Sequence, residues 1–241
     1  MGAVVTERLT KIYRRGVVGV VDLDLRVAPG DTFGFVGPNA SGKTTTIRLL
    51  MDLLRPTRGR AEILGLDTRR QSMEVRRRVG FLPGDLVLYD DLTGRQTLRL
   101  FARLRPGREP SLRDTLLMHL DFPEEALDRR VATYSTGMRQ KIGLTVALQH
   151  DPVLAILDEP TTGLDPLVRR SFHDTIRQWL RPDRTLFLSS HDIAEVEALC
   201  RTVCVLRQGR VVAHDTTERL KEGAGTGASL EDAILSHYRR P

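Results

Sequence analysis

The sequence lacks an apolar run long enough to form a membrane-spanning helix. Such a helix needs about 18 consecutive apolar residues, and charged residues interrupt the apolar stretches of this chain before that length. The first residues, MGAVVTERLTKIYRR, carry charges where a signal peptide has its apolar core. We therefore expect a cytosolic protein, whose role at a membrane would require a partner.

Cysteine is scarce, with Cys200 and Cys204 as the only two in the chain. Two thiolates cannot complete a four-ligand structural zinc site, and their spacing is unlike that of a zinc knuckle. Cysteine otherwise behaves as a small apolar residue. We expect both residues to be buried free thiols.

Lysine is also scarce, since Lys11, Lys43, Lys141 and Lys221 are the only lysines among 37 basic residues. The net charge of +6 therefore comes mostly from arginine. A basic chain can bind nucleic acid or an anionic membrane surface. These arginines are spread along the sequence apart from short clusters such as RRR at 76–78, so we interpret the charge as a bias of composition and expect no nucleic-acid partner.

The segment GPNASGKT fits the phosphate-binding pattern G-x-x-x-x-G-K-[ST]. A short apolar stretch, typical of a buried strand, precedes it, and apolar residues at helical spacing follow it, as the pattern requires. Backbone N–H groups of such a loop converge on an anion together with the positive end of the helix. We expect Lys43 to reach the β- and γ-phosphates of a nucleoside triphosphate, and Thr44 to bind Mg²⁺. The residues expected to hold the nucleotide here are Gly37, Pro38, Asn39, Ala40, Ser41, Gly42, Lys43, Thr44 and Thr45.

Two acidic residues follow a wholly apolar strand in VLAILDEP. Ligands of open α/β sheets bind at the carboxyl ends of strands, so Asp158 is expected to hold Mg²⁺ through water and Glu159 to act as general base for a hydrolytic water. Another apolar stretch, TLFLSS, ends at His191. A single histidine is usually structural, but this position favours contact with the γ-phosphate.

Together these motifs resemble those of the ATP-binding subunits of ABC (ATP-binding cassette) transporters. GPNASGKTT resembles the Walker A motif of that family, and LAILDEP resembles its Walker B motif with the adjacent glutamate. YSTGMRQK resembles its signature motif, a variant of LSGGQ, which separates this family from other P-loop NTPases. TTGLDP resembles its D-loop, and SSHD contains its switch histidine. The resemblance extends to about Asp215.

The resemblance implies an ATPase that works as a head-to-tail dimer, with ATP and Mg²⁺ bound between two cassettes. Ser135, Thr136 and Gly137 would close on the partner's γ-phosphate, and Tyr13 would stack on adenine. Asp165 of the D-loop is carried over as part of the nucleotide site. Both halves of the site are present in one chain, so the partner is expected to be a second copy or a close paralogue.

One position departs from the family pattern. The strand VGFLP is followed by Gly84, where the family usually has a glutamine that contacts Mg²⁺ and water. Asp85 is the nearest replacement, because Mg²⁺ prefers oxygen ligands. The alternative is that Gly84 and Asp85 are simply a turn pair, and the sequence leaves both open.

The alternation of strands and helices predicts an α/β fold with a mostly parallel sheet and crossover helices. The resemblance implies that this is a P-loop NTPase core, with an N-terminal antiparallel β subdomain and an α-helical subdomain carrying the signature. We expect one domain over 1–241, with the helical subdomain at about 93–149 and Thr93 as a helix N-cap. The signature helix is expected over about 138–149. AEILGLD is expected as one strand, and Val21, Leu23, Leu25 and Val27 as the alternating residues of another. A flexible linker over 223–229 and a short amphipathic helix are expected to end the chain.

The expected function is that of an ATP-driven motor on the cytoplasmic face of the cell membrane, bound to a separate integral membrane permease. The region from Phe81 to Tyr89 and the helix after Thr93 are expected to form the docking face. Resemblance favours the exporter branch of the family, whose members handle drugs, lipids or other amphiphiles. The alternative is a soluble ABC ATPase that acts on DNA or ribosomes. Such relatives carry coiled coils, zinc insertions or a second cassette, and this sequence has none of these.

Overall fold

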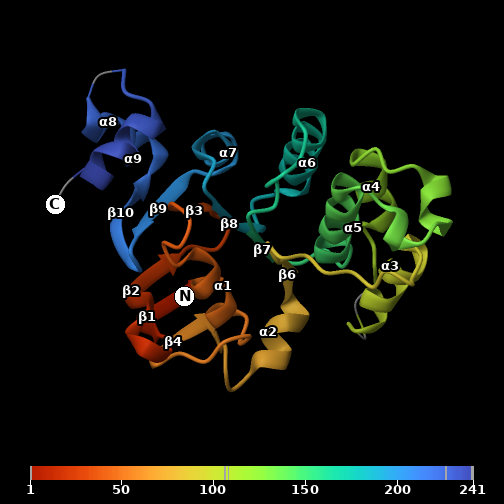
Figure 1. Ribbon diagram of the computed structural model, residues 1–241, viewed down its shortest axis with the longest axis horizontal. Helices are drawn as coiled ribbons and strands as arrows, with labels where there is room; N and C mark the ends of the chain where they lie inside the picture. The colour runs from red at the N-terminus through yellow and green to blue at the C-terminus, as the bar shows by residue number, and fades with distance from the viewer. Residues whose placement is uncertain (1, 106, 108, 226, 240–241) are drawn as a thin grey trace.

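The structure is a computed structural model, and it describes residues 2–105, 107, 109–225 and 227–239. Its strands form two sheets (Figure 1). The antiparallel sheet has the order β2-β1-β4-β5, with β1 (Val4–Ile12), β2 (Val18–Val27), β4 (Arg58–Ile63) and β5 (Leu66–Asp67). The larger sheet has the order β10-β9-β3-β8-β7-β6, with β3 (Thr32–Val36), β6 (Val79–Leu82), β7 (Leu154–Asp158), β8 (Thr185–Ser190), β9 (Thr202–Arg207) and β10 (Arg210–Thr216).

The larger sheet is parallel apart from its edge strand β10, which runs antiparallel to β9. Parallel neighbours require crossover connections, and here the crossovers contain helices. The helices are α1 (Lys43–Leu50), α2 (Ser72–Arg78), α3 (Gly94–Arg103), α4 (Arg113–His119), α5 (Thr136–Leu148), α6 (Pro166–Trp179), α7 (Ile193–Leu199), α8 (Thr217–Ala224) and α9 (Leu230–Arg239). The predicted α/β class, with an antiparallel sheet beside a mostly parallel one, is confirmed.

The core lies on both faces of the central strands. All five residues of β7 and all six of β8 are buried, which explains why these segments are continuous apolar runs rather than alternating ones. On one face Phe33, Phe35 and Phe187 pack together. The ring centroid of Phe187 lies 5.1 Å from that of Phe33 and 5.5 Å from that of Phe35. Cys200 and Cys204 are buried free thiols, as predicted.

Helices α3, α4 and α5 gather at one end of the molecule, and α8 and α9 at the other (Figure 1). The first group has its own apolar cluster, which includes Leu98, Leu117 and Ile142. Thr93 is the N-cap of α3, as predicted: its hydroxyl accepts from the Gln96 N–H at 3.2 Å, while Gln96 Oε1 accepts from the Thr93 N–H at 2.9 Å. This reciprocal capping box fixes where the helical region begins.

Several boundaries differ from the predictions. AEILGLD is two antiparallel strands, β4 and β5, because Leu64 and Gly65 take positive φ values of 52° and 75° and turn the chain. In β2, Asp22 has φ 49° and lies where the pairing with β1 shifts register. This irregularity breaks the expected alternation, so that Val20 is the buried residue and not Val21. The helix α2 was not predicted.

Two further boundaries near functional segments also moved. Helix α5 begins at Thr136 rather than near residue 138, because the Ser135 hydroxyl caps it by accepting from the Met138 N–H at 3.2 Å. The proposed linker over 223–229 is shorter than expected, since α8 extends to Ala224. Residue 226 of that stretch and residues 106 and 108 of PGREP lie outside the described residues. The amphipathic helix at the end is confirmed as α9, and its Leu230 and Ile234 are buried.

Within the described residues, no helix has both the length and the apolar character needed to cross a membrane.

The contact between β6 and α5 leaves no room for a side chain. A Cβ added at Gly80 would lie 2.4 Å from the carbonyl oxygen of Ala147, a backbone atom that cannot rotate away. We expect Gly80→Ala to lower the free energy of unfolding by about 1–3 kcal/mol, the usual cost of overpacking, as measured by urea denaturation. Gly223→Ala is the control, because a Cβ there meets none of the described atoms within 4 Å. An equal loss in both variants would contradict this account of the packing.

Candidate nucleotide-binding site

The phosphate-binding loop connects β3 to α1 and lies against the start of β2. Gly42 has φ 112°, a backbone conformation that residues with a Cβ rarely adopt. A Cβ at Gly42 would also lie 2.3 Å from the carbonyl oxygen of Gly19. The loop therefore requires glycine at this position for its backbone conformation and for its close approach to β2.

A cavity of about 410 Å³ opens beside this loop. It brings together nine of the residues predicted from the sequence with three that were not predicted. The predicted ones are Tyr13, Asn39, Ala40, Ser41, Gly42, Lys43, Thr44, Thr45 and Glu159, and the others are Val17, Val18 and Gly19.

Lys43 joins the loop to the end of β7. Its side chain is buried, and Nζ donates to the carbonyl oxygens of Gly37 at 2.7 Å and Pro38 at 3.3 Å. Nζ also forms an ion pair with Glu159 Oε1 at 3.1 Å. The ammonium group therefore lies between the loop and the carboxylate at the strand end.

The Glu159 side chain contacts three other side chains, those of Lys43, His191 and Thr162. Its second oxygen, Oε2, lies 2.9 Å from His191 Nδ1 and accepts a hydrogen bond from the Thr162 hydroxyl at 3.2 Å. Partial burial would raise the pKa of Glu159, but the hydrogen bond and charge of Lys43, with a smaller contribution from His191, outweigh burial and lower it. Glu159 is therefore ionised at neutral pH, as a general base must be.

Asp158 lies deeper, with 2% of its surface exposed. The Ser189 hydroxyl donates to its Oδ1, and Thr44 also hydrogen-bonds to the carboxylate. Burial is the main cause that raises the pKa of Asp158, and the two hydroxyl groups oppose it.

Thr44 and Asp158 thus lie side by side and offer oxygen atoms, which suit Mg²⁺. Among the described residues, no group of three or more His, Cys, Asp or Glu side chains could hold a metal.

Tyr13 is the aromatic residue that lines the cavity. Its hydroxyl lies 3.0 Å from Thr45 Oγ1, and Lys11 Nζ lies 5.5 Å from the ring centroid. Tyr13 as a whole is 38% exposed, so part of this aromatic residue beside the loop is accessible to solvent.

The predicted signature and D-loop residues lie outside this cavity. Ser135 and Thr136 are exposed at the N-terminus of α5, and Gly137 follows them in the helix. Asp165 caps α6, where Oδ1 accepts from the N–H groups of Leu167 and Val168 at 3.0 Å each. Within a single chain, these four residues do not line the cavity beside the phosphate-binding loop.

The two possibilities for Gly84 and Asp85 can be compared with their contacts. The Gly84 backbone passes close to Asp158, since a Cβ at Gly84 would lie 3.1 Å from the Asp158 carbonyl oxygen. The Asp85 side chain is 71% exposed and pairs with Arg48 Nη2 at 2.9 Å. These contacts favour the turn-pair alternative, although Asp85 as a metal ligand stays an untested prediction.

Sequence reasoning missed several site residues. Val17, Val18 and Gly19 line the cavity, Ser189 bonds Asp158, and the Thr162 hydroxyl bonds Glu159. Ser189 precedes His191 by two residues and Thr162 follows Glu159 by three. Nearness to these predicted residues was the only sign in the sequence that Ser189 and Thr162 belong to the site. The cavity wall at 17–19 depends on how β2 packs against the loop, which no motif in the sequence encodes.

Comparison with known proteins identifies the family. The family model described as ABC transporter matches residues 20–162, which is more than half of the chain. This chain belongs to the ABC transporter family and is an ABC ATPase domain. It is 40% identical over 216 residues to the daunorubicin resistance ATP-binding protein DrrA3 of Streptomyces coeruleorubidus, covering 88% of this chain and 67% of that protein. Against two much longer rodent relatives, the chain spans 10% of their length.

Solved structures have the same fold. One described as the ATP binding subunit of an ABC transporter superposes with a TM-score of 0.89 and 29% identity, over 98% of this chain and 100% of that one. The ATP-binding cassette MJ0796, described as a dimer in a post-hydrolysis state bound to ADP and Pi, gives a TM-score of 0.80 and 21% identity over 88% of this chain and 98% of its own. The superposition on the first of these structures covers 98% of this chain, so both sheets and the helical region belong to the shared fold.

The raised pKa of Asp158 predicts how this residue affects stability. A carboxyl whose pKa is higher in the folded state contributes stability below its unfolded pKa, and that contribution is lost as pH rises through the folded pKa. Asp158→Asn removes the buried charge, so we expect a higher midpoint of thermal unfolding at pH 7 without nucleotide. The difference should disappear as the pH falls below the folded pKa.

The control is Asp85→Asn, which alters an exposed carboxylate and should give no comparable gain. A lower midpoint for Asp158→Asn at pH 7 would contradict the assignment of burial as the dominant effect on this carboxyl.

Proposed function

We propose that this protein hydrolyses ATP as the motor subunit of an ABC transporter, driving a separate membrane permease. The observation that carries the proposal is the Glu159 carboxylate, held ionised between Lys43 and His191 at the edge of the phosphate-binding cavity. An ionised carboxylate beside a phosphate site can accept a proton from an attacking water.

The reaction follows from these positions. Water attacks the γ-phosphorus, the bond from that phosphorus to the β–γ bridging oxygen breaks, and Glu159 takes the water proton, giving ADP and inorganic phosphate. Lys43 binds the β- and γ-phosphates, and His191 contacts the γ-phosphate. Thr44, and Asp158 through water, would hold Mg²⁺, which would supply positive charge to offset that of the phosphates. Tyr13 stacks on the adenine.

The proposed site is completed by a second chain. Ser135, Thr136 and Gly137 lie outside their own cavity and are accessible at the N-terminus of a helix, which is suited to an anion from another molecule. We assign them, with Asp165, to the nucleotide held by a partner cassette. The pair is a homodimer or a dimer with a close paralogue, as the dimeric state described for MJ0796 supports.

The permease is proposed to dock where β6 meets the helical region. An apolar cavity of about 260 Å³ there is lined by Phe81, Leu82, Leu86 and Phe101 among others. Val87 on its rim is 85% exposed, and Tyr89 next to it is 62% exposed, so large apolar side chains remain uncovered. Binding there would hold the protein on the cytoplasmic face of the cell membrane.

The similarity to DrrA3 supports the exporter branch and substrates of the drug, lipid or amphiphile kind. The substrate itself would be selected by the permease.

The role of Glu159 is tested by Glu159→Gln. We expect turnover to fall by about 10²–10⁴-fold, the usual contribution of a general base, while ATP binding survives and an ATP-bound dimer accumulates. Phosphate release, nucleotide binding and size-exclusion chromatography measure these. Glu197→Gln is the control, because it alters a glutamate on α7 that pairs with Lys221. Turnover at the wild-type rate in Glu159→Gln would place the base elsewhere.

The docking face is tested by charge substitutions. Asp90 pairs with Arg139 at 2.8 Å, so its reversal also disturbs α5, and Val87→Glu is the cleaner variant. We expect Val87→Glu to reduce recovery of the permease with tagged protein from detergent-solubilised membranes by about tenfold, as loss of an apolar anchor does. Met118→Glu, at a 68% exposed position on α4, is the control. Unchanged recovery with Val87→Glu and with Asp90–Asp91 reversal would remove this face from the proposal.

A further inference from the structure

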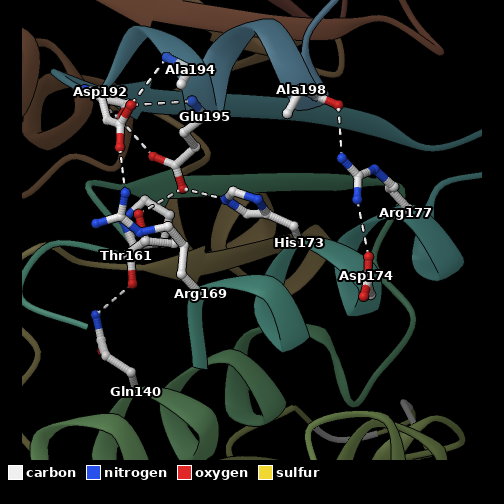
Figure 2. A network of polar contacts seen from close by, with 12 residues as sticks. Gln140, Thr161, Arg169, His173, Asp174, Arg177, Asp192, Ala194, Glu195 and Ala198 are labelled. Atoms are coloured by element: carbon white, nitrogen blue, oxygen red, sulfur yellow. Dashed lines mark hydrogen bonds and ion pairs between the residues drawn. The ribbon is translucent and has the colours of Figure 1, made fainter. Parts of the chain in front are cut away.

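Glu195 on α7 is a buried carboxylate with no arginine or lysine partner among the described residues. Its side chain is 1% exposed. Oε1 accepts from the Thr161 hydroxyl at 2.8 Å and lies 3.3 Å from His173 Nε2 (Figure 2). Oε2 accepts from the Ser190 hydroxyl at 2.6 Å. A buried carboxylate costs free energy unless hydrogen bonds satisfy it. Here the two hydroxyl donors come from the turn after β7 and from the end of β8, and the histidine comes from α6.

Two of these donors flank the catalytic pair. Thr161 follows Glu159 by two residues, and Ser190 immediately precedes His191. The same carboxylate therefore ties the segment after the proposed base to the segment before the histidine that contacts it. These two hydrogen bonds to Glu195 therefore help to keep Glu159 and His191 in contact, at 2.9 Å.

The turn that contains Glu159 is also held from its other side. Gln140 on the signature helix α5 points toward this turn (Figure 2). Its Nε2 donates to the Pro160 carbonyl oxygen at 2.9 Å. The Glu159 N–H donates to the Ser189 carbonyl oxygen at 3.0 Å. Residues 159, 160 and 161 are thus each bonded to a different segment: β8, α5 and α7.

The backbone at Glu159 needs such support. Its φ is 46°, in the left-handed region that is unfavourable for residues with a Cβ. A residue holds this conformation when the surrounding structure over-determines it. Without the bonds at Pro160 and Thr161, the turn could relax to an ordinary backbone conformation, and the carboxylate would leave its place between Lys43 and His191.

We propose that Glu195 is a positioning residue for ATP hydrolysis, which holds the turn 159–161 against His191 so that the Glu159 carboxylate faces the bound nucleotide. This inference rests on the proposed role of Glu159 as the base. The residue type matters because an ionised carboxylate is an acceptor only and can take both hydroxyl hydrogens at once. Glutamine accepts one hydroxyl and donates to the other, and alanine leaves both hydroxyl groups without their acceptor.

The test is the steady-state kinetics of ATP hydrolysis by the full chain. We expect Glu195→Ala to lower kcat by about 10- to 100-fold, the effect of moving a catalytic group by roughly 1 Å. The KM for ATP should change far less, because Lys43 keeps its hydrogen bonds to the Gly37 and Pro38 carbonyl oxygens and the phosphate-binding loop keeps its sequence. Glu195→Gln should recover most of the lost kcat.

A control separates positioning from general destabilisation. Asp31 is another buried carboxylate that accepts from a threonine, Thr202, at 3.2 Å, and it lies at the start of β3, away from the phosphate loop. Asp31→Ala should lower stability without the loss of kcat. If Glu195→Ala fails to fold, Thr161→Val removes one of its donors with little change of shape and should also lower kcat.

A double variant shows whether Glu195 acts through the base. Adding Glu195→Ala to Glu159→Gln should give no further loss of kcat, because the group being positioned is already absent. Full kcat in Glu195→Ala or Thr161→Val, or an equal loss of kcat in Asp31→Ala, would overturn the proposal while leaving the base assignment intact. Wild-type turnover in Glu159→Gln alone would refute the base itself, and the positioning role with it.

Discussion

The ion pair between Lys43 and Glu159 is the contact on which the arrangement of the site depends. It spans 3.1 Å and joins the start of α1 to the end of β7, two segments that are far apart in the sequence. It also keeps Glu159 ionised although burial acts in the opposite direction. The phosphate loop and the Glu159 carboxylate are thereby placed around one small volume, where opposite charges attract strongly because water is partly excluded.

The sheet makes this contact possible. Strand β8 lies between β3 and β7, so the ends of these three parallel strands meet at one edge. That edge receives the phosphate loop from β3, the two acids from β7, and His191 from β8. Because β7 and β8 are buried on both faces, neither strand can shift without exposing apolar side chains. The stability of the core therefore fixes the distances within the site.

The sequence predicts the parts of the site that are local in the chain. The loop at 37–44, the acids at 158–159 and His191 are recognisable because each motif is short and adjoins an apolar strand. What depends on packing between distant segments is not predictable in this way. The cavity wall at Val18, the pairing of Asp85 with Arg48, and the burial of Glu195 follow from side chains that meet only in the folded chain. The strand and helix boundaries that were wrong lie where single residues with positive φ, or a capping hydroxyl, decide the turn.

In the proposed dimer two chains share each nucleotide, one providing Lys43 and the other Gly137. The direct measurement is ATP hydrolysis in an equimolar mixture of two inactive variants, Lys43→Ala and Gly137→Asp. In a mixed dimer, one site combines an intact phosphate loop with an intact signature, so the mixture should regain turnover that neither variant shows alone. If the mixture stays inactive although mixed dimers form, the signature does not act across the interface, and the account is contradicted.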